Sequence, residues 1–277
     1  MALRLRCGKF LLDLSRPLVM GIVNLTDDSF SGDGLGEDVA RALAQAHRMV
    51  EEGADLLDVG AESSRPGAEP VPAGKEMARV MAALDVLVPL GVPVSVDTVR
   101  PEVMSAAIAS GAALINDINA LRAPGALAAV AGSEVGVCLM HMRGEPRTMQ
   151  QNPGYGDVVG DVKAFLAERV EAAENSGIAR DRVLLDPGFG FGKTVRHNWE
   201  ILRRLEEFGD LGLPVLAGLS RKSMLGAVTG RPPGERQVAS AAAAMLAARN
   251  GARVLRVHDV AATRDALAVL AAMEQGE

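Results

Sequence analysis

The chain has 277 residues, 48% of them hydrophobic and 23% charged, with a net charge of −6 and a pI of about 5.4. This composition is typical of a globular protein, and the acidic balance argues against nucleic acid and anionic membranes as partners. Only two cysteines occur, Cys7 and Cys138, without a metal-binding spacing, so neither a disulfide framework nor a zinc site is expected.

The start of the chain predicts a short β-hairpin over residues 3–14, with Gly8 and Lys9 at its turn. Charged residues interrupt this segment, so it does not read as a signal peptide, and a reducing cytoplasm is the expected location. The apolar stretch 239–248 is shorter than the roughly 20 residues that a membrane-spanning helix requires, so no membrane association is expected.

After the hairpin, one pattern repeats along the chain: a short apolar run ends in a polar residue and is followed by a loop and an amphipathic stretch. The pattern predicts strands over 18–23, 55–59, 93–96, 113–116, 135–140, 182–186, 214–217 and 253–257. Apolar spacing of 3.6 residues predicts helices over 38–52, 157–176 and 259–274, among others.

Strands that alternate with helices fit either a closed barrel or an open doubly wound sheet. The repeating units are nearly equal in length, and no GxGxxG motif follows the first strand, which disfavours the open sheet. The sequence therefore predicts an α/β fold of the (β/α)8 TIM-barrel type, as a single domain over residues 1–277, with the hairpin capping its bottom.

Every predicted strand is followed by polar or ionisable side chains. They are Asn24, Asp58, Asp97, Asn116 with Asp117, His141, Asp186, Ser220 with Lys222, and Arg256 with His258. Helix capping is the simplest explanation for the Asp, Asn and Ser residues. It does not account for Lys222, Arg256 and His258, which are poor caps. A barrel gathers all these positions at one end, where its active site lies.

Charge divides these strand-end residues into two groups. Lys222, Arg256 and His258 follow the last two strands, where barrels often bind phosphate, and they indicate an anionic substrate. On the opposite side we expect the acceptors Asp97, Asn116 and Asp186, which suit a ring with several N–H donors, such as an aminopyrimidinone. The alternative is a buried salt-bridge network between these carboxylates and Lys222.

Three loops are rich in glycine. Those over 24–36 and 60–68 are predicted to fold over a ligand, and the first carries oxygen atoms suited to Mg²⁺ beside a diphosphate; the alternative is two flexible surface loops. Residues 186–194 meet the G-x-x-x-x-G-K-[ST] spacing of a nucleotide-binding loop, but a barrel is the wrong context for one. Two phenylalanines in that loop instead suit the walls of a site for a flat aromatic ring.

Eight ordered motifs resemble the dihydropteroate synthase family of the folate pathway, from Pro17 to Thr263. They are MGIVNLTDDSFS (20–31), AESSRPGA (61–68), SVDT (95–98), IND (115–117), HMRGEPRTMQ (141–150), DPGFGFGKT (186–194), GLSRKS (218–223) and RVHDV (256–260). The resemblance implies a cytoplasmic, homodimeric transferase, a target of sulfonamides, that joins a dihydropterin diphosphate to 4-aminobenzoate.

The resemblance also implies a role for each matching residue. Asp97, Asn116, Asp186 and Lys222 would bind the pterin edge, with Met140 against the ring. Asn24, Arg256 and His258 would bind the diphosphate, and Asn24 would help to hold Mg²⁺. Phe30, Ser64, Arg65, Pro66, Phe189, Lys222 and Ser223 would form the aminobenzoate pocket. Lys222, Arg256, His258, Asp97, Asp33 and Arg65 would support catalysis.

The first loop departs from the family pattern. The family commonly has SFSDGG, whereas this chain has SFSGDG over 29–34, so the acid expected to pair with Arg65 is shifted to Asp33. If Asp33 does not reach Arg65, pterin binding would survive while turnover would suffer. Three other hypotheses therefore stand beside the synthase: a catalytically silent pterin-binding paralogue, a pterin-binding methyltransferase barrel, and an aldolase that uses Lys222 as a Schiff base.

Overall fold

The structure, a computed structural model, describes residues 3–25, 35–61, 71–151 and 153–276, with the side chains of Asn24 and of residues 35–38 outside the description. One parallel sheet forms its centre, in the order β8-β7-β6-β5-β4-β3-β10-β9. Its strands are β3 (Leu18–Asn24), β4 (Leu56–Gly60), β5 (Val94–Asp97), β6 (Leu114–Asp117), β7 (Gly136–Met140), β8 (Val183–Asp186), β9 (Leu216–Ala217) and β10 (Val254–Val257). A parallel bridge between Leu185 and Val215 joins the two ends of this order, so the sheet is a nearly closed barrel.

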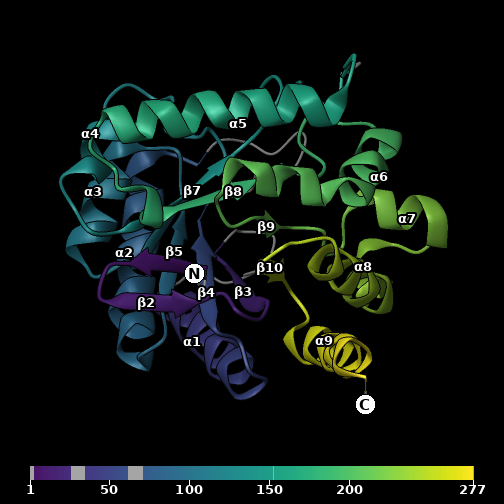
Figure 1. The fold of residues 1–277 in the computed structure, drawn as a ribbon. Coiled ribbons are helices and arrows are strands. Elements are labelled where there is room, and N and C mark those ends of the chain that lie inside the picture. The colour runs from purple at the N-terminus through teal and green to yellow at the C-terminus, as the bar shows by residue number, and fades with distance from the viewer. Residues whose placement is uncertain (1–2, 26–34, 62–70, 152, 277) are drawn as a thin grey trace.

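Helices surround the barrel (Figure 1). They are α1 (Leu35–Glu51), α2 (Ala73–Leu87), α3 (Pro101–Ala109), α4 (Ala126–Ala131), α5 (Val158–Asn175), α6 (Val195–Arg203), α7 (Ser223–Thr229), α8 (Gln237–Arg249) and α9 (Val260–Gln275). The predicted barrel is thereby confirmed and the open sheet is wrong. The predicted helices over 38–52, 157–176 and 259–274 correspond to α1, α5 and α9. Within the described ranges, no helix is long and apolar enough to cross a membrane.

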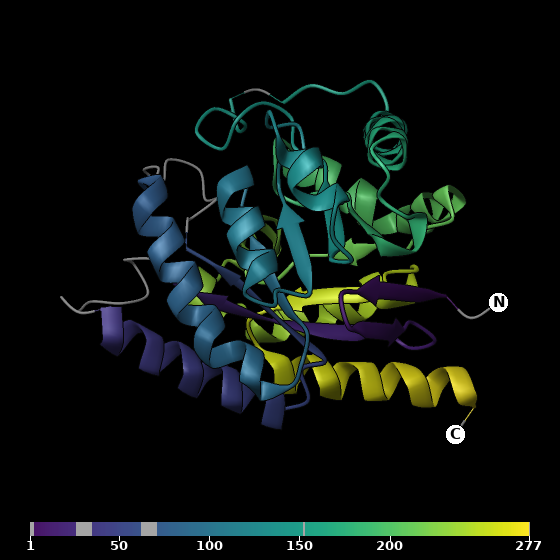
Figure 2. The ribbon, with the colours of Figure 1, turned by 90° about the vertical axis from the view of Figure 1, so that its left-hand side faces the viewer.

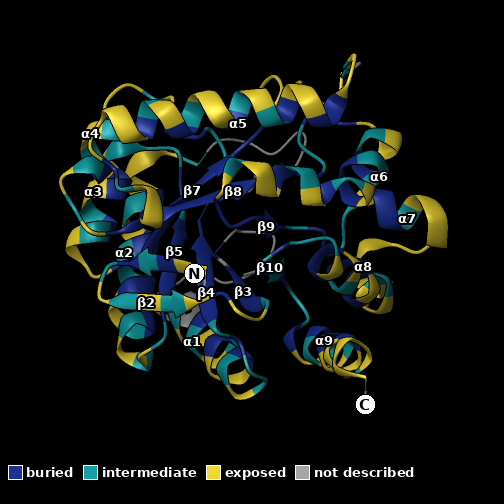
Figure 3. Ribbon diagram, in the orientation of Figure 1, coloured by how far each residue is buried: buried dark blue, intermediate teal, exposed yellow. Residues whose placement is uncertain are grey.

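The strands of the barrel are mostly buried (Figure 3), and they are apolar on both faces because each face meets a different part of the core. Side chains alternate along a strand. On β3, Val19 and Val23 belong to the cluster between sheet and helices, whereas Met20 belongs to a second cluster inside the barrel. Leu56 and Leu57 of β4 divide in the same way. This double burial explains why the strands read as unbroken apolar runs in the sequence.

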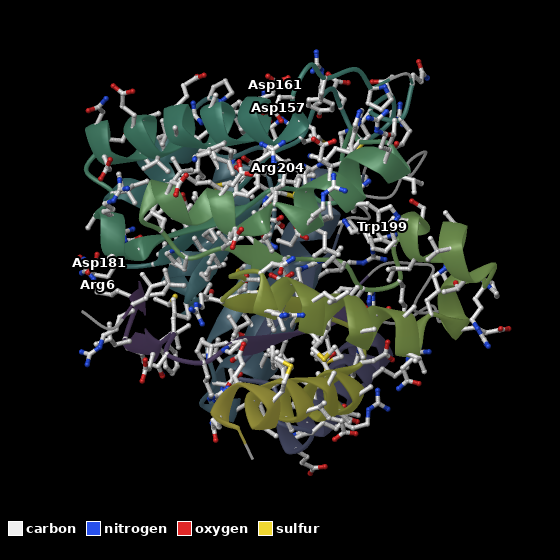
Figure 4. All side chains as sticks on the ribbon, turned by 45° about the vertical axis from the view of Figure 1, so that its right-hand side comes forward. Arg6, Asp157, Asp161, Asp181, Trp199 and Arg204 are labelled. Carbon is white, nitrogen blue, oxygen red and sulfur yellow. The ribbon has the colours of Figure 1, made fainter. Side chains whose placement is uncertain are left out.

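The amino-terminal hairpin closes one end of the barrel, as predicted. It consists of β1 (Arg4–Cys7) and β2 (Phe10–Asp13), and Leu5 and Cys7 are fully buried in the interior cluster. Arg6 Nη2 donates to Asp181 Oδ1 at 3.0 Å, and Gly8 N donates to Glu134 O just before β7 (Figures 2 and 4). The hairpin therefore covers the amino-terminal ends of the strands, which leaves their carboxyl ends for a functional site.

Candidate active site

Arg256 lies at the centre of a group of acceptors at the carboxyl ends of the strands. Its Nε donates to Asp58 Oδ2 at 2.6 Å, and its Nη2 donates to Asp97 Oδ2 at 3.1 Å. Ser95 Oγ donates to Asp58 Oδ1 at 2.5 Å, and Asn116 Nδ2 lies 3.5 Å from both Asp58 oxygens. The predicted separation of Arg256 from Asp97 and Asn116 into two groups is therefore wrong, because Arg256 bonds directly to Asp97 and shares Asp58 with Asn116.

Burial sets the electrostatics of this group. It raises the pKa of Asp97, and the positive charge of Arg256 opposes that shift. Burial lowers the pKa of Arg256, but the carboxylates of Asp58 and Asp97 outweigh it and raise the pKa above its ordinary value. Arg256 therefore stays charged. The predicted salt-bridge network does exist here, but its cation is Arg256 and not Lys222.

Asp58 is among the polar strand-end residues of the sequence, but neither the sequence pattern nor the resemblance gave it a role in the site. Its side chain is 0% exposed, and its two oxygens receive hydrogen bonds from three other strands, through Ser95, Asn116 and Arg256. A buried carboxylate held in this way orients both a cation and an amide toward the site. The identity of Asp58 signals a polar strand end, but its partners are distant in sequence and only the fold reveals them.

Asp186 and Lys222 form a second part of the site, beside the loop after β8. Asp186 is buried, its Oδ1 accepts from Gly188 N at 2.7 Å, and burial raises its pKa. Lys222 Nζ donates to the carbonyl oxygen of Phe189 and lies 4.3 Å from the ring centroid of Phe191. Burial lowers the pKa of Lys222 to about 8, against the attraction of Asp186.

This geometry corrects the prediction for Phe189. Its side chain is 1% exposed and packs in the core between sheet and helices, so it does not form the wall of an open pocket. Phe191 is the aromatic ring that faces Lys222, and it also packs beside Met140, which ends β7. The sequence shows two phenylalanines in this loop, but its spacing does not determine which ring faces the site and which packs in the core.

Lys193 ends the segment that resembles a nucleotide-binding loop. It is buried, and its Nζ lies 2.9 Å from His141 Nδ1 and donates to the carbonyl oxygens of Gly188 and Phe191 at 2.9 and 3.1 Å. Gly188 has a φ of +71°, and a Cβ there would lie 1.9 Å from the oxygen of His141. Lys193 therefore joins the loops after β7 and β8 and is not available to a phosphate.

Two of the polar strand ends, Asp117 and His141, are bound by neighbouring parts of the protein. Asp117 accepts from the backbone N–H groups of Asn119 and Leu121 at 2.7 Å each, which holds a turn in which Leu121 has a φ of +56°. The pKa of His141 is lowered to about 3, first by burial and then by Lys193, so His141 is neutral. Asp117 therefore holds the backbone of a turn, and His141 is bound to Lys193, so both residues have a structural role.

His258 follows β10 and is held by a serine. Its Nδ1 lies 2.9 Å from Ser220 Oγ, which also accepts from the backbone N–H of His258 at 3.2 Å. Ser220 thus fixes the ring near Arg256, a role that the sequence alone did not assign. Two further residues predicted for the site lie at the ends of other elements. Ser223 is the exposed first residue of α7. The backbone of Asn24 ends β3, beside Gly60 of β4.

Five predicted residues lie outside the described part of the chain: Phe30, Asp33, Ser64, Arg65 and Pro66. The predicted contact between Asp33 and Arg65, and the predicted closure of the loops that carry them, therefore remain predictions.

A barrel with buried carboxylate and amide acceptors at its strand ends, next to Arg256 and Lys222, defines an enzyme of the pterin-binding class. The family described as "Pterin binding enzyme" matches residues 20–258. The dihydropteroate synthase of Haemophilus influenzae is 49% identical over 259 residues, which cover 93% of this chain and 94% of that protein. The chain belongs to the dihydropteroate synthase family.

Solved structures agree with the sequence relatives. The Xanthomonas albilineans dihydropteroate synthase with 4-aminobenzoic acid superposes with a TM-score of 0.92, at 52% identity and 99% coverage of both chains. The Yersinia pestis enzyme in a sulfonamide drug complex superposes with a TM-score of 0.93, at 44% identity over 98% of this chain and 99% of that one. The predicted transferase function is confirmed at the level of the family, and the methyltransferase and aldolase hypotheses are set aside.

Proposed function

We propose that this chain condenses 6-hydroxymethyl-7,8-dihydropterin diphosphate with 4-aminobenzoate to 7,8-dihydropteroate and diphosphate. The observation that carries the proposal is a group of acceptors beside the charged Arg256 and Lys222: the buried Asn116 and Asp186 and the partly buried Asp97. An aminopyrimidinone edge offers several N–H donors to such acceptors, and bonds between N–H groups and carboxylates are stronger than bonds between neutral partners.

The pterin ring is assigned to the space between Asp186, Asn116 and Lys222. Asp186 keeps Oδ2 for the ring because Oδ1 already accepts from Gly188. Lys222 provides a donor toward the ring oxygen and nitrogen atoms, and Met140 provides an apolar surface against the ring face. Asp97, which Arg256 already orients, completes the acceptors on the far edge.

The diphosphate is assigned to Arg256 and His258. Nε and Nη2 of Arg256 donate to Asp58 and Asp97, while Nη1 has no acceptor among the described residues, so it is available to a phosphate oxygen. The amide oxygen of Asn24, at the end of neighbouring β3, is the ligand that this chain would offer to Mg²⁺. A single oxygen ligand fits this ion, because Mg²⁺ is commonly held by one or two protein groups together with substrate phosphates. When bound, Mg²⁺ neutralises charge on the leaving diphosphate.

The aminobenzoate is assigned to the region beside Phe191 and Lys222. Ser223 and four residues predicted from the sequence complete this pocket: Phe30, Ser64, Arg65 and Pro66. The ring of Phe191 offers an apolar face, and the ammonium of Lys222 lies over that face. Phe191 takes the place that the sequence-based prediction gave to Phe189.

The reaction then needs no covalent nucleophile from the protein. The bond between the pterin methylene carbon and the diphosphate oxygen breaks, and Arg256 and His258 stabilise the charge that develops on the leaving oxygen. The carboxylates around the ring stabilise the methylene cation. The amine of 4-aminobenzoate forms the new C–N bond and loses one proton, to the departing diphosphate or to solvent.

The experiment that tests this proposal is a direct assay of dihydropteroate formation. We expect the purified protein to form product with both substrates and Mg²⁺, and to lose activity in excess EDTA and regain it when Mg²⁺ is restored. Binding of the pterin diphosphate in calorimetry without any product would instead identify the silent paralogue and would direct attention to Asp33.

We also propose that the protein is a homodimer that associates through α6, α7 and α8. Val195, Val228, Val238 and Leu246 are exposed on these neighbouring helices, by 39, 63, 83 and 40% respectively. On α8, Ala241, Ala244 and Ala248 pack inward, so its alanines serve the barrel while Val238 and Leu246 face outward. A surface groove on α6 is lined by Val195, Arg196, Trp199, Glu200 and Arg203; Trp199 is labelled in Figure 4.

Introducing charge on this face is expected to separate the subunits. The double variant Val238→Asp/Leu246→Asp would bury four carboxylates in the dimer, so we expect the mass measured by sedimentation to fall to that of one chain. Val269→Asp on α9, where Val269 is 67% exposed, is the matched control and should keep the mass of the wild type. An unchanged mass in the double variant would place the interface elsewhere.

The cytoplasm is the proposed location. The thiols of Cys7 and Cys138 are both buried and unpaired, and a reducing compartment keeps such thiols in that state. The small-molecule substrates make nucleic acid or membrane partners unnecessary for the reaction.

A further inference from the structure

The loop that carries Lys222 has a strained backbone. Arg221, directly before Lys222, has a φ of +60°, a conformation that residues other than glycine seldom adopt. Such conformations persist where the surroundings fix them, and they concentrate at functional sites. The contacts that hold Arg221 and Lys222 in place therefore determine where the ammonium of Lys222 points.

Arg236, which lies just before α8, provides these contacts. Its Nη1 donates to the carbonyl oxygens of Arg221 and Lys222, at 2.9 and 3.2 Å, and its Nε donates to Arg231 O at 2.8 Å. Ser240 adds a further bond, because its Oγ accepts from the backbone N–H of Arg221 at 3.0 Å and donates to Arg236 O at 2.6 Å. One guanidinium and one hydroxyl thus hold the peptide groups on both sides of the strained residue.

Gly226 provides the space in which the guanidinium lies. It occupies the middle of α7, where glycine is unfavourable for a helix and has no positive φ to justify it. A Cβ on Gly226 would lie 2.1 Å from Nη2 and 2.4 Å from Cζ of Arg236. The glycine is therefore explained by the arginine that packs against it.

Asp259 also binds this loop, but it contacts the side chain of Arg221 and not the backbone. Its carboxylate accepts from Nη2 and Nε of Arg221, at 2.9 and 3.3 Å, and so it holds the side chain of Arg221. The carbonyl oxygens of Arg221 and Lys222 are bound by Arg236. Both Asp259 and Arg236 come from outside α7, so the position of Lys222 depends on how α8 and α9 pack against that helix.

We propose that Arg236, packed over Gly226, is a positioning residue that fixes the backbone of Lys222 and thereby aims its ammonium at the substrates. Arg236 itself touches neither the substrates nor the reacting atoms. The inference rests on the proposed role of Lys222 in binding the pterin and the aminobenzoate.

The test compares Gly226→Ala, Arg236→Met and the double variant. In Gly226→Ala the new methyl group displaces only the end of a flexible side chain, so the fold should persist while the bonds of Arg236 to the Lys222 loop are lost. We expect each single variant to lose about tenfold to 100-fold in kcat/KM for 4-aminobenzoate, as displacements near 1 Å at a reacting site do. The double variant should be no worse than either single variant, because both remove the same contact.

Two further measurements separate a positioning role of Arg236 from a general structural one: the thermal unfolding of Gly226→Ala, and the activity of a control variant at another helical glycine. Alanine favours helices over glycine and so offsets part of the loss of the Arg236 hydrogen bonds, and Gly226→Ala should therefore stay folded and unfold at a temperature close to that of the wild type. Gly74→Ala is the control, because Gly74 lies within α2 with open space around its Cβ position, and its activity should not change. Wild-type kcat/KM in Gly226→Ala, or additive losses in the double variant, would overturn the proposal.

The variant Lys222→Ala distinguishes failure of the inference from failure of the proposed function. If Lys222→Ala keeps full activity, the role of Lys222 is wrong and Arg236 has nothing to position. If Lys222→Ala is inactive while Gly226→Ala and Arg236→Met are both fully active, the role of Lys222 holds and the positioning role of Arg236 is wrong.

Discussion

Replacing Arg256 with methionine is expected to remove most of the synthase activity and also to destabilise the fold. Asp58 is 0% exposed and would keep a buried charge without its cation. Breaking a buried pair in this way destabilises a protein by about 3–5 kcal/mol. Loss of a group that stabilises charge in the transition state lowers kcat by a factor of roughly 10²–10³. Urea unfolding and the product assay measure the two effects separately.

A double variant tells the two roles of Arg256 apart. In Arg256→Met/Asp58→Asn the fully buried charge of Asp58 is gone and only the more exposed Asp97 loses its cation, so we expect the free energy of unfolding to return part of the way to the wild-type value while synthesis stays low. Recovery of synthesis would mean that Arg256 serves only to neutralise Asp58 and does not bind the diphosphate. Arg231→Met is the matched control, since Arg231 pairs with Glu235 at the surface, 3.6 Å away, and exposed pairs contribute little to stability.

The fold was largely predictable because each strand is buried on both faces. Residues such as Val19 and Met20 pack on opposite sides of the sheet, so the whole strand must be apolar, and the run stops where the strand reaches the site. The change from apolar to polar residues therefore marks both the strand and its functional end. That is why the sequence alone assigns Asp97, Asn116, Asp186 and Arg256 to the same end of the barrel, although it does not predict which of them touch one another.

The contacts within the site could not be predicted in the same way. Arg256 and Asp58 are 198 positions apart, and their hydrogen bond depends on the stagger of strands around the barrel, which no local pattern encodes. In the loop after β8, glycines with positive φ decide that Phe189 turns into the core and Phe191 toward Lys222. Local spacing also suggested a phosphate-binding role for Lys193, whereas its partners are oxygens of two loops and a neutral histidine.

Activity is expected to fall as the pH rises through about 8, because burial lowers the pKa of Lys222 to about 8. Above that pH the ammonium loses its proton and can no longer serve as a charged donor to the substrates. Lys222→Arg should move this loss of activity to higher pH, since arginine keeps its charge. Lys222→Ala should lower kcat/KM by roughly 10²-fold or more at every pH, as the loss of an electrostatic contact in a buried site does.

The contribution of Lys222 to the free energy of unfolding should rise over the same pH range in which activity falls. Loss of activity through titration of Lys222 can therefore be distinguished from loss of activity through unfolding. A lysine in the unfolded chain has a pKa of about 10.4, so between pH 8 and pH 10 the unfolded state holds more protons at this position than the folded state. The contribution of Lys222 to stability therefore increases as the pH rises through this window and is lost as the pH falls through about 8. Parallel profiles of kcat/KM and thermal unfolding, for the wild type and Lys222→Arg, test both statements. An activity that stays level to pH 9.5 in the wild type would show that the charge of Lys222 is not used.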